Sequence, residues 1–148
     1  METLQAKVLQ LYISTGDKTN PRLEVDSITV DPKGVVNDKF YAKDANRAIL
    51  LASKTAYKLA EENNIELENG ALGENIYLDI NPCSLIPGDK LVIGDVSFEI
   101  TQNCTLCKGL SSINAKLPKL LKDDRGIFAK ALHKGSISVG DKIKFDRS

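Results

Sequence analysis

The sequence predicts one mainly β domain over residues 1–148, a barrel or sandwich with one or two short helices. Segments in which apolar and polar residues alternate recur along the chain, and in one of them Val96, Phe98 and Ile100 fall on the same face. Turn sequences containing Gly, Asp and Pro separate these segments, as is typical of sandwiches and barrels. Only residues 54–63 show a clear helical pattern, so we expect little helix.

The strands follow one another along most of the chain. They are expected at residues 7–14, 25–30, 76–78, 90–93, 96–101, 127–131 and 142–145. A turn is expected at residues 31–34, and periodicity alone cannot assign the apolar run 48–51. Ser53 is a favourable N-cap for the helix that follows it. Pro118 interrupts a second helical stretch between residues 111 and 121, which should therefore be short or bent.

Composition excludes several functional classes. The 148 residues include 42% apolar and 27% charged side chains, and Lys plus Arg equals Asp plus Glu at 20 each. A neutral chain offers no general basic field for nucleic acid. No apolar run approaches the roughly 18 residues of a membrane-spanning helix, and no signal peptide is visible at the start of the sequence. With only three cysteines, an odd number, we expect a reducing, cytoplasmic location rather than a disulfide-stabilised protein.

Two of the cysteines, Cys104 and Cys107, follow the strand expected at 96–101. A thiol at a strand end is held in position, and the neighbouring Lys108 favours its thiolate form. Structural zinc needs four ligands, and only Cys83 and His133 could complete the set, at unusual spacing. A thioredoxin-like dithiol should precede a helix in a βαβ pattern. The third alternative, which the sequence favours, is one working thiol, Cys107, with Cys104 as a bystander or resolving partner.

Polar residues at strand ends are further candidates. Glu74 and Asn75 precede the strand at 76–78 and could offer a ligand an acceptor and amide donors, or Asn75 could simply bond local backbone in a turn. Arg125 precedes another strand and could hold a phosphate through its planar guanidinium, or be an exposed turn residue. Lys39 and Arg47 are further cations without a strong local signal.

Five motifs occur in an order that resembles the MOSC domain, which is found at the C-terminus of molybdenum cofactor sulfurases and in small stand-alone proteins. The motifs are Gly73-Glu74-Asn75-Ile76, Pro87-Gly88-Asp89, the segment leading to Cys107, Arg125-Gly126-Ile127, and residues 135–141. The resemblance spans nearly the whole chain and is strongest after Gly73. It implies a MOSC-type β-barrel with few helices.

The resemblance also implies a site. Cys107 matches the family's characteristic cysteine, thought to carry sulfur or to contact molybdenum, so it is the implied catalytic residue and molybdenum ligand. Arg47 and Arg125 match family arginines, and Glu74 and Asn75 match the Gly-Glu-Asn motif. Molybdopterin bears a phosphate and a sulfur-bound metal, so cations and a soft thiolate are the groups such a site requires.

One departure concerns residues 37–40. The family usually has Gly-Asp-Arg/Lys-His near this place, where this chain reads Asn37-Asp38-Lys39-Phe40. Lys39 therefore keeps the cation and is an implied cofactor contact, whereas Phe40 stands where a histidine is usual.

The expected function is binding of molybdenum cofactor or transport of sulfur, and a molybdenum-dependent reductase is one form of it. The alternative is a β-barrel binding module that has lost the chemistry. We expect neither the pyridoxal-dependent sulfurase domain nor the additional β-barrel domain that accompanies the larger family enzymes, so the expected partner is a separate cysteine desulfurase or electron donor. Neither nucleic acid nor a membrane is an expected partner.

Overall fold

A computed structural model describes residues 2–15, 17, 19, 22–67, 72–103, 114–121 and 126–146. Seven of its strands form a closed barrel, in the order β11-β7-β8-β9-β5-β6-β1, with β11 pairing back onto β1. These strands are β1 (Glu2–Ser14), β5 (Ile49–Ser53), β6 (Ile76–Leu78), β7 (Lys90–Ile93), β8 (Val96–Asn103), β9 (Ile127–Ala131) and β11 (Lys142–Asp146). Closure leaves no free edges among these strands. The predicted mainly β barrel is confirmed.

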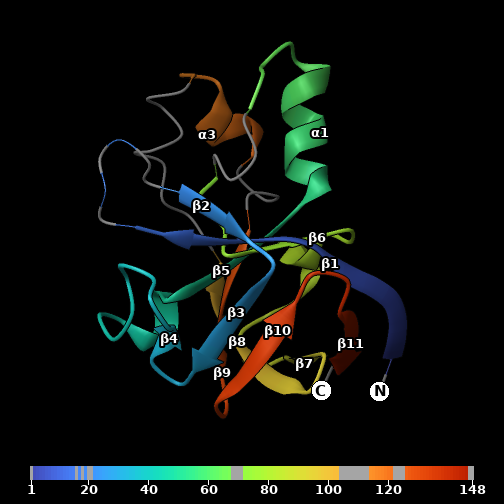
Figure 1. Cartoon of the computed structure of the whole chain (residues 1–148). Coiled ribbons are helices and arrows are strands. Elements are labelled where there is room, and N and C mark those ends of the chain that lie inside the picture. The colour runs from blue at the N-terminus through green and yellow to red at the C-terminus, as the bar shows by residue number, and fades with distance from the viewer. Residues whose placement is uncertain are drawn as a thin grey trace.

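A second, three-stranded sheet lies in front of the barrel in Figure 1. Its order is β10-β3-β4, from β10 (Gly135–Ser138), β3 (Ser27–Asp31) and β4 (Gly34–Val35). The predicted turn at 31–34 joins β3 to β4. Gly34 has a φ of 130°, and a Cβ there would lie 2.8 Å from the Ala48 Cβ, so both the backbone conformation and the space require glycine.

The N-terminal strands differ from the expected boundaries because they pair with several partners. β1 begins at Glu2 rather than residue 7, since it pairs first with β11, then with β6, and finally with β2 (Arg22–Val25). The segment expected at 25–30 is divided at Asp26, because β2 belongs to the barrel sheet and β3 to the smaller sheet. Such pairings depend on distant residues and leave no local signal.

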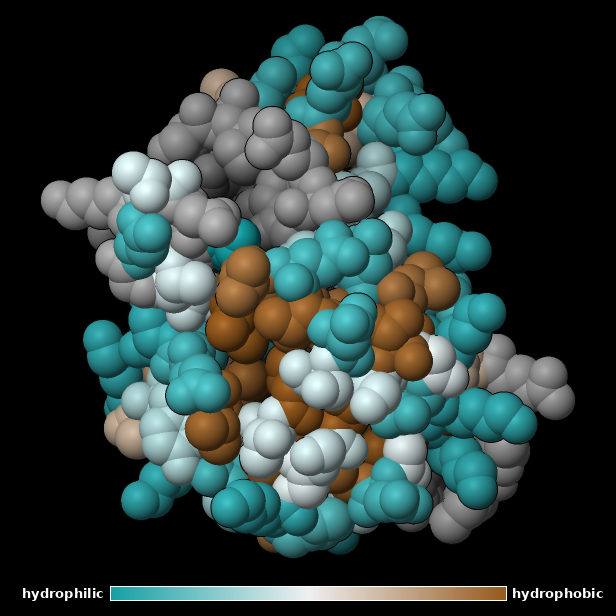
Figure 2. Space-filling model, viewed as in Figure 1, coloured by the Kyte–Doolittle hydropathy of each residue, from teal (hydrophilic) through white to brown (hydrophobic). Residues whose placement is uncertain are grey.

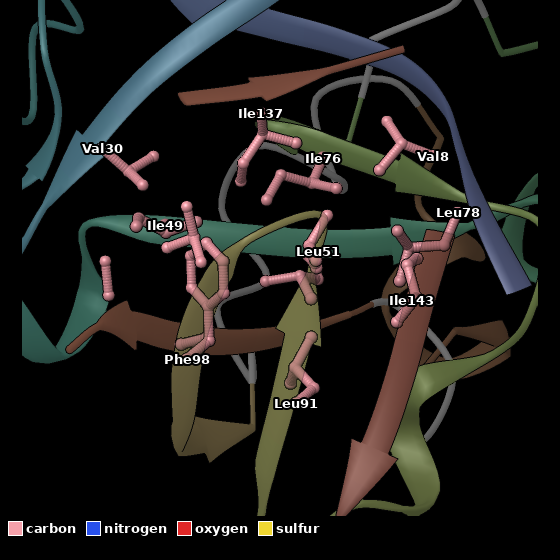
Figure 3. Packing of buried hydrophobic residues seen from close by; sticks show 14 of the residues in the cluster. Val8, Val30, Ile49, Leu51, Ile76, Leu78, Leu91, Phe98, Ile137 and Ile143 are labelled. Atoms are coloured by element: carbon pink, nitrogen blue, oxygen red, sulfur yellow. The ribbon is translucent and has the colours of Figure 1, made fainter. Parts of the chain in front are cut away.

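The barrel interior is apolar. Val96, Phe98 and Ile100, predicted to share a face, are 1%, 0% and 1% exposed. Figure 3 shows their neighbours pointing inward from strands all around the barrel, among them Leu51 and Ile143. The unassigned run 48–51 lies largely in β5, which is buried throughout. It pairs in parallel with β6 and antiparallel with β9. Its two faces are both buried, with Leu51 in the barrel core and Ala52 in the cluster beneath the helices, so its sequence does not alternate.

The two α-helices of the described ranges, α1 (Lys54–Glu62) and α3 (Leu117–Leu120), lie together at one end of the barrel (Figure 1). α1 begins where expected, because the Ser53 hydroxyl accepts a hydrogen bond from the Thr55 amide at 3.2 Å. α3 is short and contains Pro118, as predicted. A second apolar cluster joins the two helices to the barrel, formed by Ala52, Ala56, Ala60, Ile65, Leu72, Leu117 and Leu121.

The hydropathy of the surface differs between the helical end and the barrel. In Figure 2 the helical end shows mainly hydrophilic residues outward, and hydrophobic residues gather across the middle of this face. Two 3₁₀-helices, η1 (Ala45–Arg47) and η2 (Pro82–Ser84), complete the described elements. No helix in the described ranges is long and apolar enough to span a membrane.

Candidate functional site

An open cavity of about 430 Å³ lies beside β5, β9 and η1. Its volume is within the range typical of small-molecule sites. Residues from the end of β1, from the chain around η1, from β5, from the segment before β6 and from β9 line it: Ser14, Phe40, Lys43, Asp44, Arg47, Ala48, Leu50, Leu72, Gly73, Asn75 and Phe128. Because these residues come from distant parts of the sequence, only the closed barrel brings them together.

Two cations and an aromatic wall define the cavity. Lys43 is exposed and Arg47 is half-buried, with its guanidinium carbon 5.5 Å from the centre of the Phe128 ring. Phe128 and Leu50 form a small buried apolar cluster of their own. The carboxylate of Asp44 accepts a hydrogen bond from the Asn46 amide at 3.0 Å and so caps η1. A ligand here would meet two cations and the Asp44 carboxylate beside an apolar, aromatic surface.

The position of Arg47 is set by η1. The Thr101 hydroxyl of β8 donates to the Asn46 carbonyl at 2.5 Å, which ties η1 to the barrel. Arg47 is the last residue of η1 and immediately precedes Ala48, which is buried. This short helix therefore holds the predicted arginine at the cavity.

Asn75 lines the cavity but uses its side chain within the protein. Its Oδ1 accepts from the Leu50 amide at 3.1 Å, and its Nδ2 donates to the Tyr12 carbonyl at 3.3 Å and to Asp38 Oδ1 at 3.2 Å. Its main chain also bonds Leu50 and Tyr12, at 2.8 Å each. Asn75 thus joins β5 to β1 just before β6 begins.

Glu74 is fully buried and lies behind the cavity lining. The Tyr57 hydroxyl of α1 donates to its carboxylate at 2.5 Å, and Arg22 donates to its main-chain carbonyl. Burial lowers the pKa of Arg22, and the charges of Glu74 and Asp38 act in the opposite direction. Glu74 therefore connects α1 and β2 to the Gly-Glu-Asn segment.

The remaining residues predicted for the site are Lys39, Cys104, Cys107 and Arg125. Lys39 is exposed, with its Nζ 5.0 Å from the centre of the Phe40 ring, and it does not line the cavity, whereas Phe40 does. Cys104, Cys107 and Arg125 lie outside the described residues, so their roles stay predictions.

The flanks of the segment that carries Cys104, Cys107 and Arg125 are described. Asn103, at the end of β8, pairs with Ile127 of β9, and Gln102 pairs with Phe128. The chain therefore leaves β8 and enters β9 at positions next to a residue of the cavity wall. Gly126 is required there, because a Cβ would lie 2.6 Å from the Leu51 carbonyl oxygen.

No sequence pattern singles out Ser14, Lys43 or Phe128 as site residues, nor Arg22, which contacts Ser14 and Glu74. Lys43 lies in a polar, irregular segment, where a single lysine carries no distinguishing signal. Phe128 fits the alternation of a strand and would be expected in the core. The carbonyl of Glu74, which Arg22 contacts, is 52 residues away in sequence.

His133 and Cys83 lie elsewhere. The Nε2 of His133 accepts from the Ser97 amide at 3.2 Å beside the turn between β9 and β10, and Cys83 is half-buried in η2. Neither residue lines the cavity. Within the described ranges, no three His, Cys, Asp or Glu side chains gather closely enough to hold a metal ion.

The four tyrosines give a pH prediction. Burial, with smaller contributions from Glu24 and Glu74, raises the pKa of Tyr12 to about 12. Burial followed by Glu74 also raises the pKa of Tyr57 and Tyr77, and the hydrogen bond to Asp31 raises that of Tyr41.

Unfolded phenols lose their proton near pH 10, so stability should fall as pH rises through about 10 toward about 12. We expect little tyrosinate absorbance from folded protein at about pH 10, and a rise that coincides with loss of the β circular dichroism signal. The urea-unfolded chain is the control and should titrate near 10. Folded protein that titrates like the unfolded control would contradict the described tyrosine environments.

The comparisons with known proteins agree with the barrel. The model of the MOSC domain matches residues 32–144, most of the chain. This protein therefore belongs to the MOSC domain family, as the motifs suggested. A search of curated protein sequences finds no match.

Solved structures share the fold at low sequence identity. The YUAD protein from Bacillus subtilis superposes with a TM-score of 0.84 at 16% identity, covering 99% of both chains. YiiM from Geobacillus stearothermophilus superposes with a TM-score of 0.71 at 18% sequence identity, and the match covers 96% of this chain and 75% of the YiiM chain. YiiM from Escherichia coli superposes with a TM-score of 0.67 at 17% sequence identity, and the match covers 100% of this chain and 71% of the YiiM chain. These similarities extend the fold assignment to almost the whole chain.

Proposed function

We propose that the cavity binds molybdenum cofactor or a closely related pterin phosphate, with Cys107 as its metal ligand or as a carrier of sulfur. The observation that carries this proposal is the pairing of two cations, Lys43 and Arg47, with the aromatic wall of Phe128 in one cavity. The cavity also adjoins the strand ends that lead to Cys107.

The described residues fit the organic part of this cofactor. A guanidinium matches the geometry of a phosphate, and an ammonium adds a point charge beside it, so Arg47 and Lys43 suit the phosphate. Phe128 and Leu50 offer a flat apolar surface to a ring. Arg125 is proposed as a further phosphate contact and Cys107 as the soft ligand. When bound, the cofactor would supply a redox-active, sulfur-bound metal, while this chain binds and orients it.

The sulfur-carrier form of the proposal needs only the thiol and a donor. The Cys107 thiolate would attack the outer sulfur of a persulfide on a cysteine desulfurase. A sulfur–sulfur bond then forms on Cys107, the donor's sulfur–sulfur bond breaks, and the donor leaves as a thiolate. The oxidation level is conserved, so no further oxidant is needed. In the release step, the Cys104 thiolate would attack the Cys107 sulfur of this persulfide, so that a Cys104–Cys107 disulfide forms, the persulfide bond breaks and the outer sulfur leaves as hydrosulfide.

The test is the molybdenum and pterin content of protein purified from a host that makes molybdopterin. We expect both groups in the wild type, loss of molybdenum in Cys107→Ala, and at least tenfold less retained pterin in Arg47→Ala, since a charge-assisted hydrogen bond to phosphate is lost. Lys58→Ala is the matched control, because Lys58 is an exposed cation of α1 that does not line the cavity. It should load like the wild type.

The outcomes separate the competing functions. Wild-type protein without molybdenum or pterin, and unaltered by Cys107→Ala, would remove the cofactor proposal. A mass increase of one sulfur on Cys107 after incubation with a cysteine desulfurase would then favour the sulfur carrier. Equal behaviour of wild type and Cys107→Ser in all these assays would indicate a binding module without the chemistry.

A further inference from the structure

Ser14, the last residue of β1, is fixed in the cavity wall from several directions. It is only 6% exposed. Its amide donates to Asp38 Oδ1 at 2.5 Å, and its carbonyl accepts from the Lys39 amide at 2.8 Å. The main chain is therefore held on both sides, so the hydroxyl has a defined position before any ligand binds.

The Ser14 hydroxyl is also held by Arg22. The two residues are direct cross-strand partners in the β1–β2 pair, and the Arg22 Nη1 donates to the Ser14 Oγ. A guanidinium has only donors, so the oxygen must accept, and the serine hydrogen must point to another acceptor. Among the residues that the structure describes, none accepts this hydrogen, although Ser14 lines the cavity.

The charges around Ser14 indicate the kind of acceptor. The positive charge of Arg22 is offset by Glu74 and Asp38, which both interact with it electrostatically. The unburied cations lie elsewhere in the lining, on exposed Lys43 and half-buried Arg47. An anionic group therefore gains more beside Lys43 and Arg47, whereas Ser14 suits an uncharged oxygen or nitrogen.

We propose that the Ser14 hydroxyl, oriented by Arg22, donates a hydrogen bond to an uncharged ring oxygen or nitrogen of the bound ligand. This inference rests on the proposed function, in which the ligand is a pterin phosphate. It assigns an orientation: the ring contacts Ser14 at the buried side of the cavity, and the phosphate contacts Lys43 and Arg47 at the exposed side.

The test compares pterin retention in Ser14→Ala, Ser14→Thr and wild type, all purified from the molybdopterin-producing host and then dialysed. We expect Ser14→Ala to release the pterin about five- to tenfold faster, the effect of one neutral hydrogen bond. Ser14→Thr keeps the hydroxyl and suits a strand, so it should release the pterin at close to the wild-type rate. Ser138→Ala makes the same change at an exposed strand position outside the cavity lining and should have no effect.

The possible results distinguish the role of Ser14 from the proposed function. Pterin in the wild type with equal release from Ser14→Ala overturns the role of Ser14 and leaves the proposed function intact. No pterin in the wild type overturns both. If Ser138→Ala also releases pterin faster, the proposed hydrogen bond is overturned, because any such change then weakens the protein. The same holds if Ser14→Ala loses the circular dichroism signal of the folded protein and Ser14→Thr does not restore it.

Discussion

Asn75→Asp should lower the free energy of unfolding by about 3 to 5 kcal/mol at neutral pH. The substitution is nearly isosteric, so packing is kept. It replaces the Nδ2 donor with an oxygen, which then faces the Tyr12 carbonyl at 3.3 Å and Asp38 Oδ1 at 3.2 Å. Two hydrogen bonds are lost, and a second carboxylate is placed against Asp38 in a buried position. Urea unfolding monitored by circular dichroism measures the change.

The pH dependence of this variant tests the cause. Burial and the neighbouring carboxylate raise the pKa of the introduced carboxyl above its unfolded value near 3.9. The penalty is therefore full above the raised pKa and shrinks as pH falls through it, because the protonated form regains a donor. We expect the difference in the free energy of unfolding between wild type and Asn75→Asp to shrink as the pH is lowered from about 7 to about 5. A gap independent of pH would contradict the described contacts.

The matched control for this variant is Asn64→Asp. Asn64 is exposed, and the same chemical change there should alter stability by no more than about 0.5 kcal/mol. A loss as large as that of Asn75→Asp would show that general charge effects, not the bridge between β5 and β1, dominate.

Phe98→Ala should lower the free energy of unfolding by about 3 to 5 kcal/mol. Phe98 is fully buried and is among the largest side chains of the barrel core, where it lies amid the inward-pointing residues of Figure 3. Truncation removes apolar contacts and leaves a cavity that a closed barrel cannot collapse around. Denaturant midpoints with an unchanged slope would confirm that stability alone has changed.

Two comparisons bracket that result. Phe98→Leu keeps most of the apolar volume and should lose no more than about 1.5 kcal/mol. Leu132→Ala removes an apolar side chain that is 40% exposed, so its effect should stay near 0.5 kcal/mol. A Phe98→Ala loss no greater than that of Leu132→Ala would show that the barrel interior is not tightly packed.

The candidate site was predictable only in part. The family motif pointed to Asn75 and Glu74. In the structure, the side chain of Asn75 accepts a hydrogen bond from β5, and that of Glu74 accepts one from α1. Arg47 lines the cavity and its role in binding cofactor stays a prediction, whereas Lys39 is exposed outside the cavity. Ser14 was missed, because its geometry follows from Arg22, an ordinary arginine in sequence.

Sequence by itself determined the elements whose causes are local. The alternation of Val96, Phe98 and Ile100 defined a buried strand face, and Ser53 set the start of α1 through its capping hydroxyl. The motif order also identified the family correctly. Each of these signals depends on residues a few positions apart, so periodicity and capping rules suffice.

Only the tertiary structure decided what depends on distant pairing. It split residues 25–30 between two sheets and showed that β11 closes the barrel on β1. It also placed Lys43, Phe128 and Ser14 around one cavity. The physical reason is that barrel closure brings together strand ends and loops from across the whole chain, and no local pattern encodes which ends will meet.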